Sequence, residues 1–91
     1  MALVVAADPD AALLASAAAL KRLGAKIVRY DGDEGVLEAR RDTGVGSALF
    51  SVRATAEREG ATRLHVESHD ARARELLREF RRELSGKGTR R

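Results

Sequence analysis

The stretch Thr62-Arg63-Leu64-His65-Val66-Glu67-Ser68-His69 decides the fold, because its side chains alternate with the period of a β-strand and it carries both histidines of the protein. Successive side chains of a strand point to opposite faces of a sheet, so residues two apart share a face. The pattern therefore predicts a half-buried strand with an inward and an outward set of side chains. The inward set is Leu64, Val66 and Ser68, and the outward set is His65, Glu67 and His69.

The composition limits the chain to one small folded unit. Its 91 residues are 44% hydrophobic and 34% charged and include one proline, which is typical of a soluble folded domain. We expect a single domain over residues 1–85 and a flexible basic tail over residues 86–91. Aromatic residues make up only 3%, so the core must consist mainly of Ala, Leu and Val, which bury little area per residue. A partner subunit can supply the stability that such a core lacks.

The sequence contains no cysteine, which excludes disulfides, thiolate metal sites, a cysteine nucleophile and a lipid-carrying cysteine within it. The apolar run 2–7 has no basic segment before it and is far shorter than the about 20 residues that a membrane span requires. We therefore expect a soluble, cytoplasmic protein that does not bind a membrane.

A helix is predicted from Asp8 to about Leu23. Asp8 can act as the N-cap, Pro9 fits the first helical position, and Gly24 can end the helix in a left-handed conformation. The predicted core stripe of this helix is Leu13, Ala17, Leu20 and Gly24, widened by Leu14 and Leu23.

The interior of this helix is unusual because it has no charged residue from Ala11 to Leu20. A solvated helix face normally carries charge. One interpretation is that alanine is simply the best helix former. The other is that a second face of the helix packs on another subunit. That second face would consist of Ala12, Ala15, Ser16 and Ala19.

Short connectors separate four further strands, predicted at 25–30, 36–42, 47–57 and 61–69, and a short strand at 3–6 can pair at a sheet edge. Such connectors imply an antiparallel meander. A closing helix follows, with Asp70 as its expected N-cap. Its core stripe is Ala73, Leu76, Leu77, Phe80 and Leu84. The predicted fold class is α+β: a two-layer sandwich with a four- to five-stranded antiparallel meander sheet and two helices on one face.

The parity of the inward residues sets the register, since a slip by one residue would turn every side chain to the wrong face. Strands 47–57 and 61–69 both have even-numbered inward sets, which requires a loop of odd length. The segment Arg58-Glu59-Gly60 provides three residues, with Gly60 in the left-handed position of a bulged turn. This register pairs Ala54 with Leu64 and Val52 with Val66.

The strand at 36–42 has an odd-numbered inward set, so it needs an even loop, such as a two-residue Gly44-Val45 turn. Ala39 then lies opposite Phe50. The strand at 25–30 is ambiguous, because the alternation allows two pairs to face the core. These pairs are Ala25 with Ile27 and Val28 with Tyr30, and the pair that is not core adds apolar surface to the opposite side of the sheet.

His65, Glu67 and His69 project from one strand face at steps of about 6.6 Å, a geometry that can place two imidazoles and a carboxylate around one metal ion. However, the register sets Arg53 opposite His65 and diagonal to Glu67, and a guanidinium opposes a cationic metal. We therefore predict no metal ligand and no cofactor. Instead, Arg53, His65, Glu67 and His69 form a candidate binding face.

Ion pairs of Arg53 with Glu67, and of Arg40 with Glu38, are expected across this face. The glycine-rich segment 42–47 lacks the Lys-Ser/Thr ending of a phosphate-binding loop and opens no helix, so it is interpreted as a hairpin turn. The spacing of the Ser, His and Asp residues indicates no nucleophile with its base. We predict no catalytic residue and no enzyme activity.

The net charge of +3 comes from the second half of the chain, where residues 51–91 hold eleven basic and seven acidic residues. The arginines of the closing helix and the tail can neutralise phosphates of a nucleic acid. These arginines are Arg72, Arg74, Arg78, Arg81 and Arg82. Glu75, Glu79 and Glu83 interrupt them, and no aromatic residues are available to stack on bases, so the sequence argues against a nucleic-acid partner.

Three segments follow one another along the chain. They are Leu23-Gly24-Ala25-Lys26-Ile27-Val28 followed by Asp31, then Gly35-Val36-Leu37-Glu38-Ala39-Arg40, then Thr62-Arg63-Leu64-His65-Val66 with a closing helix. In this order the chain resembles, over residues 11–84, a family of small bacterial domains of unknown function that often occur on lipoproteins. The resemblance implies a two-layer sandwich with helices against one face of an antiparallel sheet. It implies no catalytic residue, and this chain lacks the lipid-anchor cysteine.

The sequence therefore predicts a non-catalytic interaction or structural module that self-associates or binds a protein partner. One alternative is a module that binds a small ligand or metal on the exposed sheet face. A second alternative is nucleic-acid binding through the basic closing helix and tail.

Overall fold

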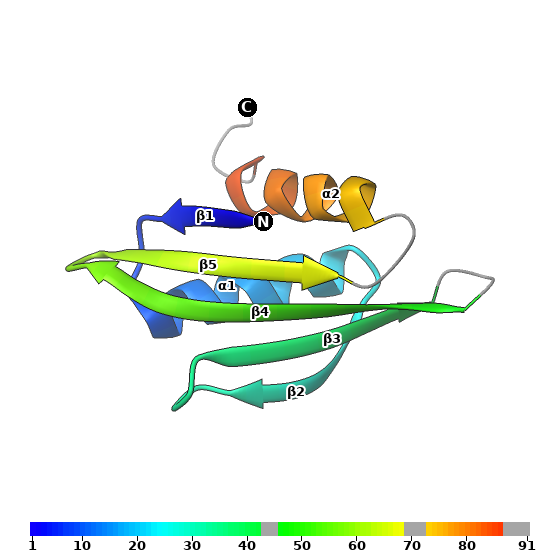
Figure 1. Ribbon diagram of the computed structural model, residues 1–91, viewed down its shortest axis with the longest axis horizontal. Coiled ribbons are helices and arrows are strands. Elements are labelled where there is room, and N and C mark those ends of the chain that lie inside the picture. Colours follow the sequence, from blue (N-terminus) through cyan, green and yellow to red (C-terminus); the bar gives the residue numbers. More distant parts are fainter. Residues whose placement is uncertain (43–45, 69–72, 87–91) are drawn as a thin grey trace.

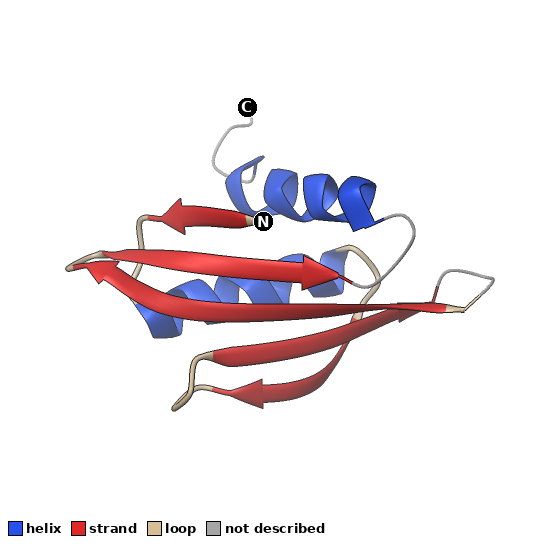
Figure 2. Cartoon of the chain, viewed as in Figure 1, coloured by secondary structure: helices blue, strands red, loops and turns tan. Residues whose placement is uncertain are grey.

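The computed structural model describes residues 1–42, 46–68 and 73–86. Five antiparallel strands form one sheet in the order β1-β5-β4-β3-β2, and two helices pack on one face of it (Figures 1 and 2). This arrangement confirms the predicted α+β sandwich. The elements are β1 (Ala2–Val5), α1 (Pro9–Arg22), β2 (Lys26–Asp31), β3 (Val36–Asp42), β4 (Ser47–Arg58), β5 (Ala61–Ser68) and α2 (Ala73–Gly86).

Helix α1 begins and ends where the sequence predicts. Asp8 is the N-cap residue with an extended backbone, although its side chain makes no capping hydrogen bond, and Pro9 occupies the first helical position. After the C-cap Leu23, Gly24 has a φ of +86°, a left-handed conformation that glycine adopts without steric cost. The chain can thus turn directly into β2.

Three of the four residues of the second face of α1 are buried within the chain and Ala15 is exposed, so the interpretation of this face as a subunit contact is wrong for those three. Ala12, Ser16 and Ala19 are at most 1% exposed, because α1 contacts both the sheet and α2. The Ser16 hydroxyl is satisfied by donating a 2.9 Å hydrogen bond to the carbonyl oxygen of Ala12. Leu14, expected to widen the core stripe, is instead 61% exposed. Burial on two sides explains the absence of charge at Ala12, Ser16 and Ala19.

The register of the central strands is confirmed. Ala54 pairs with Leu64 and Val52 with Val66 across β4 and β5, and Ala39 of β3 pairs with Phe50. Gly60 has a φ of +77° in the β4–β5 turn, beside a bulge between Ala56 and Arg58. The short first strand pairs antiparallel with β5 at the sheet edge, also as expected. The Gly44-Val45 turn, the Asp70 cap and residues 87–91 of the tail lie outside the described residues.

A β-bulge resolves the ambiguity of β2. The pairing of β2 with β3 shifts between Ile27 and Arg29, so Ile27 pairs with Ala39 while Tyr30 pairs with Leu37. Both partners belong to the core face, and the parity of β2 therefore changes at the bulge. Ile27 and Tyr30, which a regular strand would place on opposite faces, are thus both on the core side of the sheet. Tyr30 lies at the sheet edge on the helix side and remains 42% exposed.

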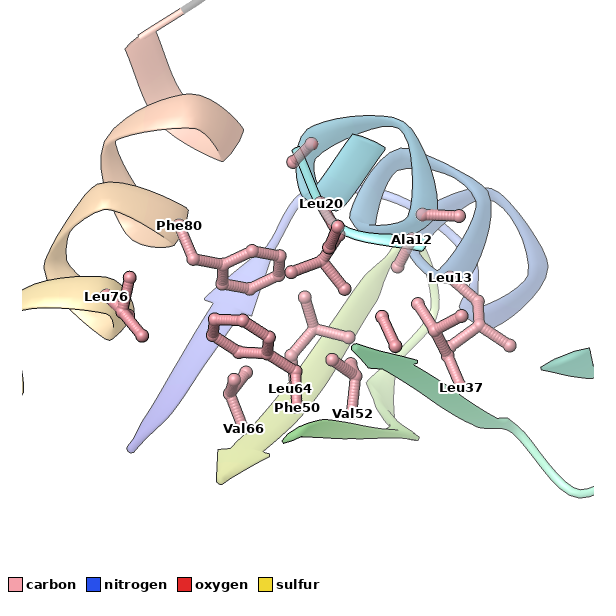
Figure 3. Packing of buried hydrophobic residues seen from close by; sticks show 14 of the residues in the cluster. Ala12, Leu13, Leu20, Leu37, Phe50, Val52, Leu64, Val66, Leu76 and Phe80 are labelled. Carbon is pink, nitrogen blue, oxygen red and sulfur yellow. The ribbon is translucent and has the colours of Figure 1, made fainter. Parts of the chain in front are cut away.

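The core lies between the sheet and both helices. Figure 3 shows Leu20 of α1 and Phe80 of α2 pointing toward Phe50 of β4, the central strand of the sheet. All three side chains are fully buried. The remaining fully buried large hydrophobic residues are Leu13, Leu37, Val52, Leu64 and Val66. Both helices therefore use the same face of the sheet, and neither α1 nor α2 covers the opposite face.

Ion pairs at the surface connect α2 to α1 and to β3, and connect the two strands of the β4–β5 hairpin. Glu83 of α2 accepts a 2.6 Å hydrogen bond from Arg22 of α1, and Glu79 accepts one of 3.2 Å from Arg41 of β3. On the β4–β5 hairpin, the Arg63 guanidinium donates two hydrogen bonds to the Glu57 carboxylate, at 2.8 and 2.9 Å. These hydrogen bonds lower the pKa of Glu57 below its ordinary value, because they stabilise the charged carboxylate.

Candidate binding surface on the open sheet face

The uncovered side of the sheet is a candidate binding surface, which we call the open face. It presents the odd-numbered side chains of β4 and β5, because the even-numbered ones point into the core. In Figure 1 the strands cross in front of α1, so the viewer looks onto this face. Its central residues are Leu49, Ser51 and Arg53 of β4 and His65 and Glu67 of β5.

An open depression of about 390 Å³ lies in the middle of this face, and it is lined by Ser51, Arg53, His65 and Glu67. The antiparallel pairing of β4 and β5 brings these side chains together, because Arg53 is directly opposite His65 and Ser51 is opposite Glu67. The structure thus gathers three of the four residues of the predicted binding face. His69, the fourth, lies outside the described residues.

Ser51 is the lining residue that the sequence interpretation missed. The signal was present, since the predicted register of Val52 with Val66 also places Ser51 opposite Glu67. A lone hydroxyl on a strand has no distinctive spacing, so the sequence pattern alone does not single out this serine. In the depression it adds a group that can both donate and accept a hydrogen bond.

The predicted ion pairs of this face do not form. Within the described part of the chain, no ion pair joins Arg53 to Glu67 or Arg40 to Glu38. Instead, Arg29 forms ion pairs with Asp31, Glu34 and Glu38. Its guanidinium nitrogens lie 3.8, 3.5 and 3.9 Å from their carboxylate oxygens, respectively. The bulge in β2 places Arg29 opposite Glu38, which explains the exchange of partners. The guanidinium of Arg53 and the carboxylate of Glu67 therefore remain available to a ligand or partner.

The chemistry of the depression is mixed. Arg53 offers up to five N–H donors, His65 and Ser51 can donate or accept, and Glu67 only accepts when ionised. Beside it, Leu49 is 42% exposed, and Val4 of β1 is 45% exposed on the same face. Such a surface can bind a partner that carries both charges and some apolar area.

A metal centre gains no support from the described side chains. Within residues 1–42, 46–68 and 73–86, no three His, Asp or Glu residues gather closely enough to hold a metal ion. The metal-binding alternative, which requires His69, stays a prediction. Neither described helix combines the length and apolarity needed to cross a bilayer.

Comparison with known proteins shows the fold alone. No protein-family model and no curated protein sequence matches the chain, so the resemblance to lipoprotein domains stays a prediction. Among solved structures, a chain in the crystal structure of the adenylate sensor from AMP-activated protein kinase, complexed with ATP, is similar with a TM-score of 0.73. The two chains are 18% identical, and the match covers 91% of this chain and 94% of the other.

Proposed function

We propose that this chain is an interaction module that self-associates through the open face of its sheet. The observation that carries the proposal is the depression at the centre of that face, which contains Arg53 and Glu67 side by side without an ion pair between them. A surface that displays both charges without pairing them is complementary to a second copy of itself.

A two-fold dimer satisfies both charges at once. In such an interface residue i of one copy meets residue j of the other, and the same contact occurs a second time. Arg53 of each copy then meets Glu67 of the other. The exposed side chains of Leu49 and Val4 leave water in the same step, which contributes about 25 cal/mol for each Å² of apolar area buried.

A charge-swap experiment tests this arrangement. Arg53→Glu and Glu67→Arg each place like charges across the interface twice, so each variant alone is expected to sediment as a monomer. An equimolar mixture of the two variants is expected to dimerise, because every cross-interface contact then joins opposite charges again. Sedimentation velocity from low to high micromolar concentration measures both results.

The matched control is Arg58→Glu, which makes the same charge reversal at an exposed arginine at the end of β4, away from the depression. This variant is expected to dimerise like the unmodified chain. An unmodified chain that stays monomeric at high micromolar concentration contradicts the proposal. A mixture that stays monomeric while the unmodified chain dimerises contradicts the Arg53–Glu67 contact.

A second candidate function is the binding of a small phosphate-bearing ligand in the same depression. Two observations favour it: a chain of similar fold occurs in the ATP complex of the adenylate sensor, and a volume of about 390 Å³ falls within the range of known ligand sites. The Arg53 guanidinium matches the geometry of a phosphate group. Glu67 opposes it, which is why we rank this function second.

Calorimetric titration with ATP and with AMP tests the second candidate. Binding is expected to weaken about tenfold in Arg53→Gln, since a hydrogen bond to a charged group contributes about 1.5 kcal/mol or more. The control Arg58→Gln removes the same charge elsewhere and is expected to bind normally. Absence of heat above the dilution background for both nucleotides contradicts this function and leaves self-association untouched.

A further inference from the structure

Helix α2 divides into three sectors around its axis. With 3.6 residues per turn, successive residues are about 100° apart. Leu76, Phe80 and Leu84 fall together in a sector that faces the core. The acidic sector contains Glu75, Glu79 and Glu83, and the arginine sector contains Arg74, Arg78, Arg81 and Arg82. The two charged sectors lie on opposite flanks of the core sector.

Two of the three glutamates are already paired within the fold. Glu79 lies 3.2 Å from Arg41 of β3, and Glu83 lies 2.6 Å from Arg22 of α1. Their carboxylates are thus directed to the flank of α2 that meets α1 and the sheet. The sequence suggests that the glutamates interrupt a basic patch, but these ion pairs direct two of the three to the flank opposite the arginines.

A groove runs along the arginine sector. It has a volume of about 260 Å³ and is lined by Met1, Arg74, Leu77, Arg78 and Arg81. Figure 1 shows the N-terminus of the chain beside α2, and Met1 is held there because Val66 donates a 2.8 Å backbone hydrogen bond to its carbonyl oxygen. The groove therefore combines an apolar floor of Met1 and Leu77 with guanidinium groups on its wall.

The charge of the groove favours a doubly charged anion. Arg74 and Arg78 are exposed and lie one helical turn apart, about 6 Å along the axis. Within the described residues no carboxylate forms an ion pair with either of them. A phosphate monoester carries about −1.5 to −2 charges at pH 7 and offers three acceptor oxygens, which suits two neighbouring guanidinium groups better than a single carboxylate does.

We propose that this groove binds a small phosphate monoester with an apolar body, whose phosphate lies between Arg74 and Arg78 and whose body lies on Met1 and Leu77. Arginine binds phosphate in a planar, bidentate geometry, and the apolar floor selects against inorganic phosphate. The site is separate from the open face and does not depend on self-association.

The single methionine of the chain provides a direct probe. Protein carrying a ¹³C-labelled Met1 methyl group, with the residue confirmed by mass spectrometry, is titrated with hexyl phosphate and, separately, with inorganic phosphate. The methyl signal is expected to shift and saturate with hexyl phosphate, and the affinity for inorganic phosphate is expected to be at least tenfold lower. Arg74→Gln and Arg78→Gln are each expected to weaken hexyl phosphate binding about tenfold.

Arg82→Gln is the matched control, because it removes an exposed arginine from the same helix without lining the groove. It is expected to bind hexyl phosphate normally. Equal weakening by Arg82→Gln overturns the proposal in favour of diffuse attraction by the basic helix. Equal affinity for hexyl phosphate and inorganic phosphate overturns the claim that Met1 and Leu77 bind the apolar body of the ligand. Binding of a single-stranded oligonucleotide without any response to hexyl phosphate overturns the site in favour of nucleic-acid binding.

Discussion

Replacing Phe50 with alanine is expected to lower the free energy of unfolding by about 3–5 kcal/mol, the range found for truncating a buried phenylalanine. Phe50 is fully buried on β4, the central strand of the sheet, and faces Phe80 of α2 (Figure 3). Its cross-strand neighbours are Ala39 of β3 and Ser68 of β5. These small side chains cannot extend into the vacated space, and strands on both sides hold the backbone of β4 in place.

The loss is large relative to the whole stability of a domain, which is about 5–15 kcal/mol. Urea unfolding followed by circular dichroism measures it. The control is Leu14→Ala, which removes an apolar side chain that is 61% exposed on α1, and it is expected to change the free energy of unfolding by no more than about 0.5 kcal/mol. A loss below about 1 kcal/mol for Phe50→Ala would show that Phe50 is not at the centre of the core.

The register of the sheet could be predicted because the side-chain period of a strand is two. Once Leu64 and Val66 were assigned to the core, the odd loop length predicted at 58–60 left a single pairing with β4. In the structure Arg58 belongs to β4 and pairs with Ala61, so the extra residue lies in the bulge between Ala56 and Arg58. Gly60 supported the pairing independently, since a left-handed residue is needed at that turn. The candidate site followed from the register, because His65 lies opposite Arg53 wherever Val66 lies opposite Val52.

The faces of α1 and β2 could not be predicted in the same way. Alanine fits a buried or an exposed helix position equally well, so only the packing of α1 against the rest of the fold shows that Ala12 and Ala19 are core residues. In β2 the bulge between Ile27 and Arg29 reverses the parity of the strand, and no glycine marks it in the sequence. The alternation therefore left the face of Tyr30 open.

The groove on α2 shows why charge counting along a helix is insufficient. Glu79 and Glu83 interrupt the arginines in the sequence, but each forms an ion pair with an arginine more than 35 positions away. Glu79 pairs with Arg41, and Glu83 pairs with Arg22. Such pairs depend on how α2 packs against α1 and the sheet. Local periodicity could locate the arginine sector, but it could not show that the glutamates are directed away from it.

The turn between β2 and β3 gives the second large expected effect. Gly35→Ala is expected to lower the free energy of unfolding by about 2–4 kcal/mol, and Gly60→Ala by only about 1–2 kcal/mol. Both glycines have a positive φ, of +70° and +77°, so both substitutions incur the cost of a left-handed alanine. They differ in the space around the added methyl group.

At Gly35 a Cβ atom would lie 2.8 Å from the backbone oxygen of Ala54, whereas at Gly60 it would meet nothing within 4 Å. The chain cannot relieve the contact by moving a side chain, because the obstacle is the backbone of the central strand. Ala54 also donates a 2.8 Å hydrogen bond to the carbonyl oxygen of Gly35, and any separation of the turn from β4 weakens it.

The difference between the two variants thus isolates the close approach from the conformational cost that they share. Urea unfolding of both variants measures that difference, and faster hydrogen exchange of the Ala54 amide in Gly35→Ala locates it. Equal losses for the two variants would show that the turn can move away from β4 freely.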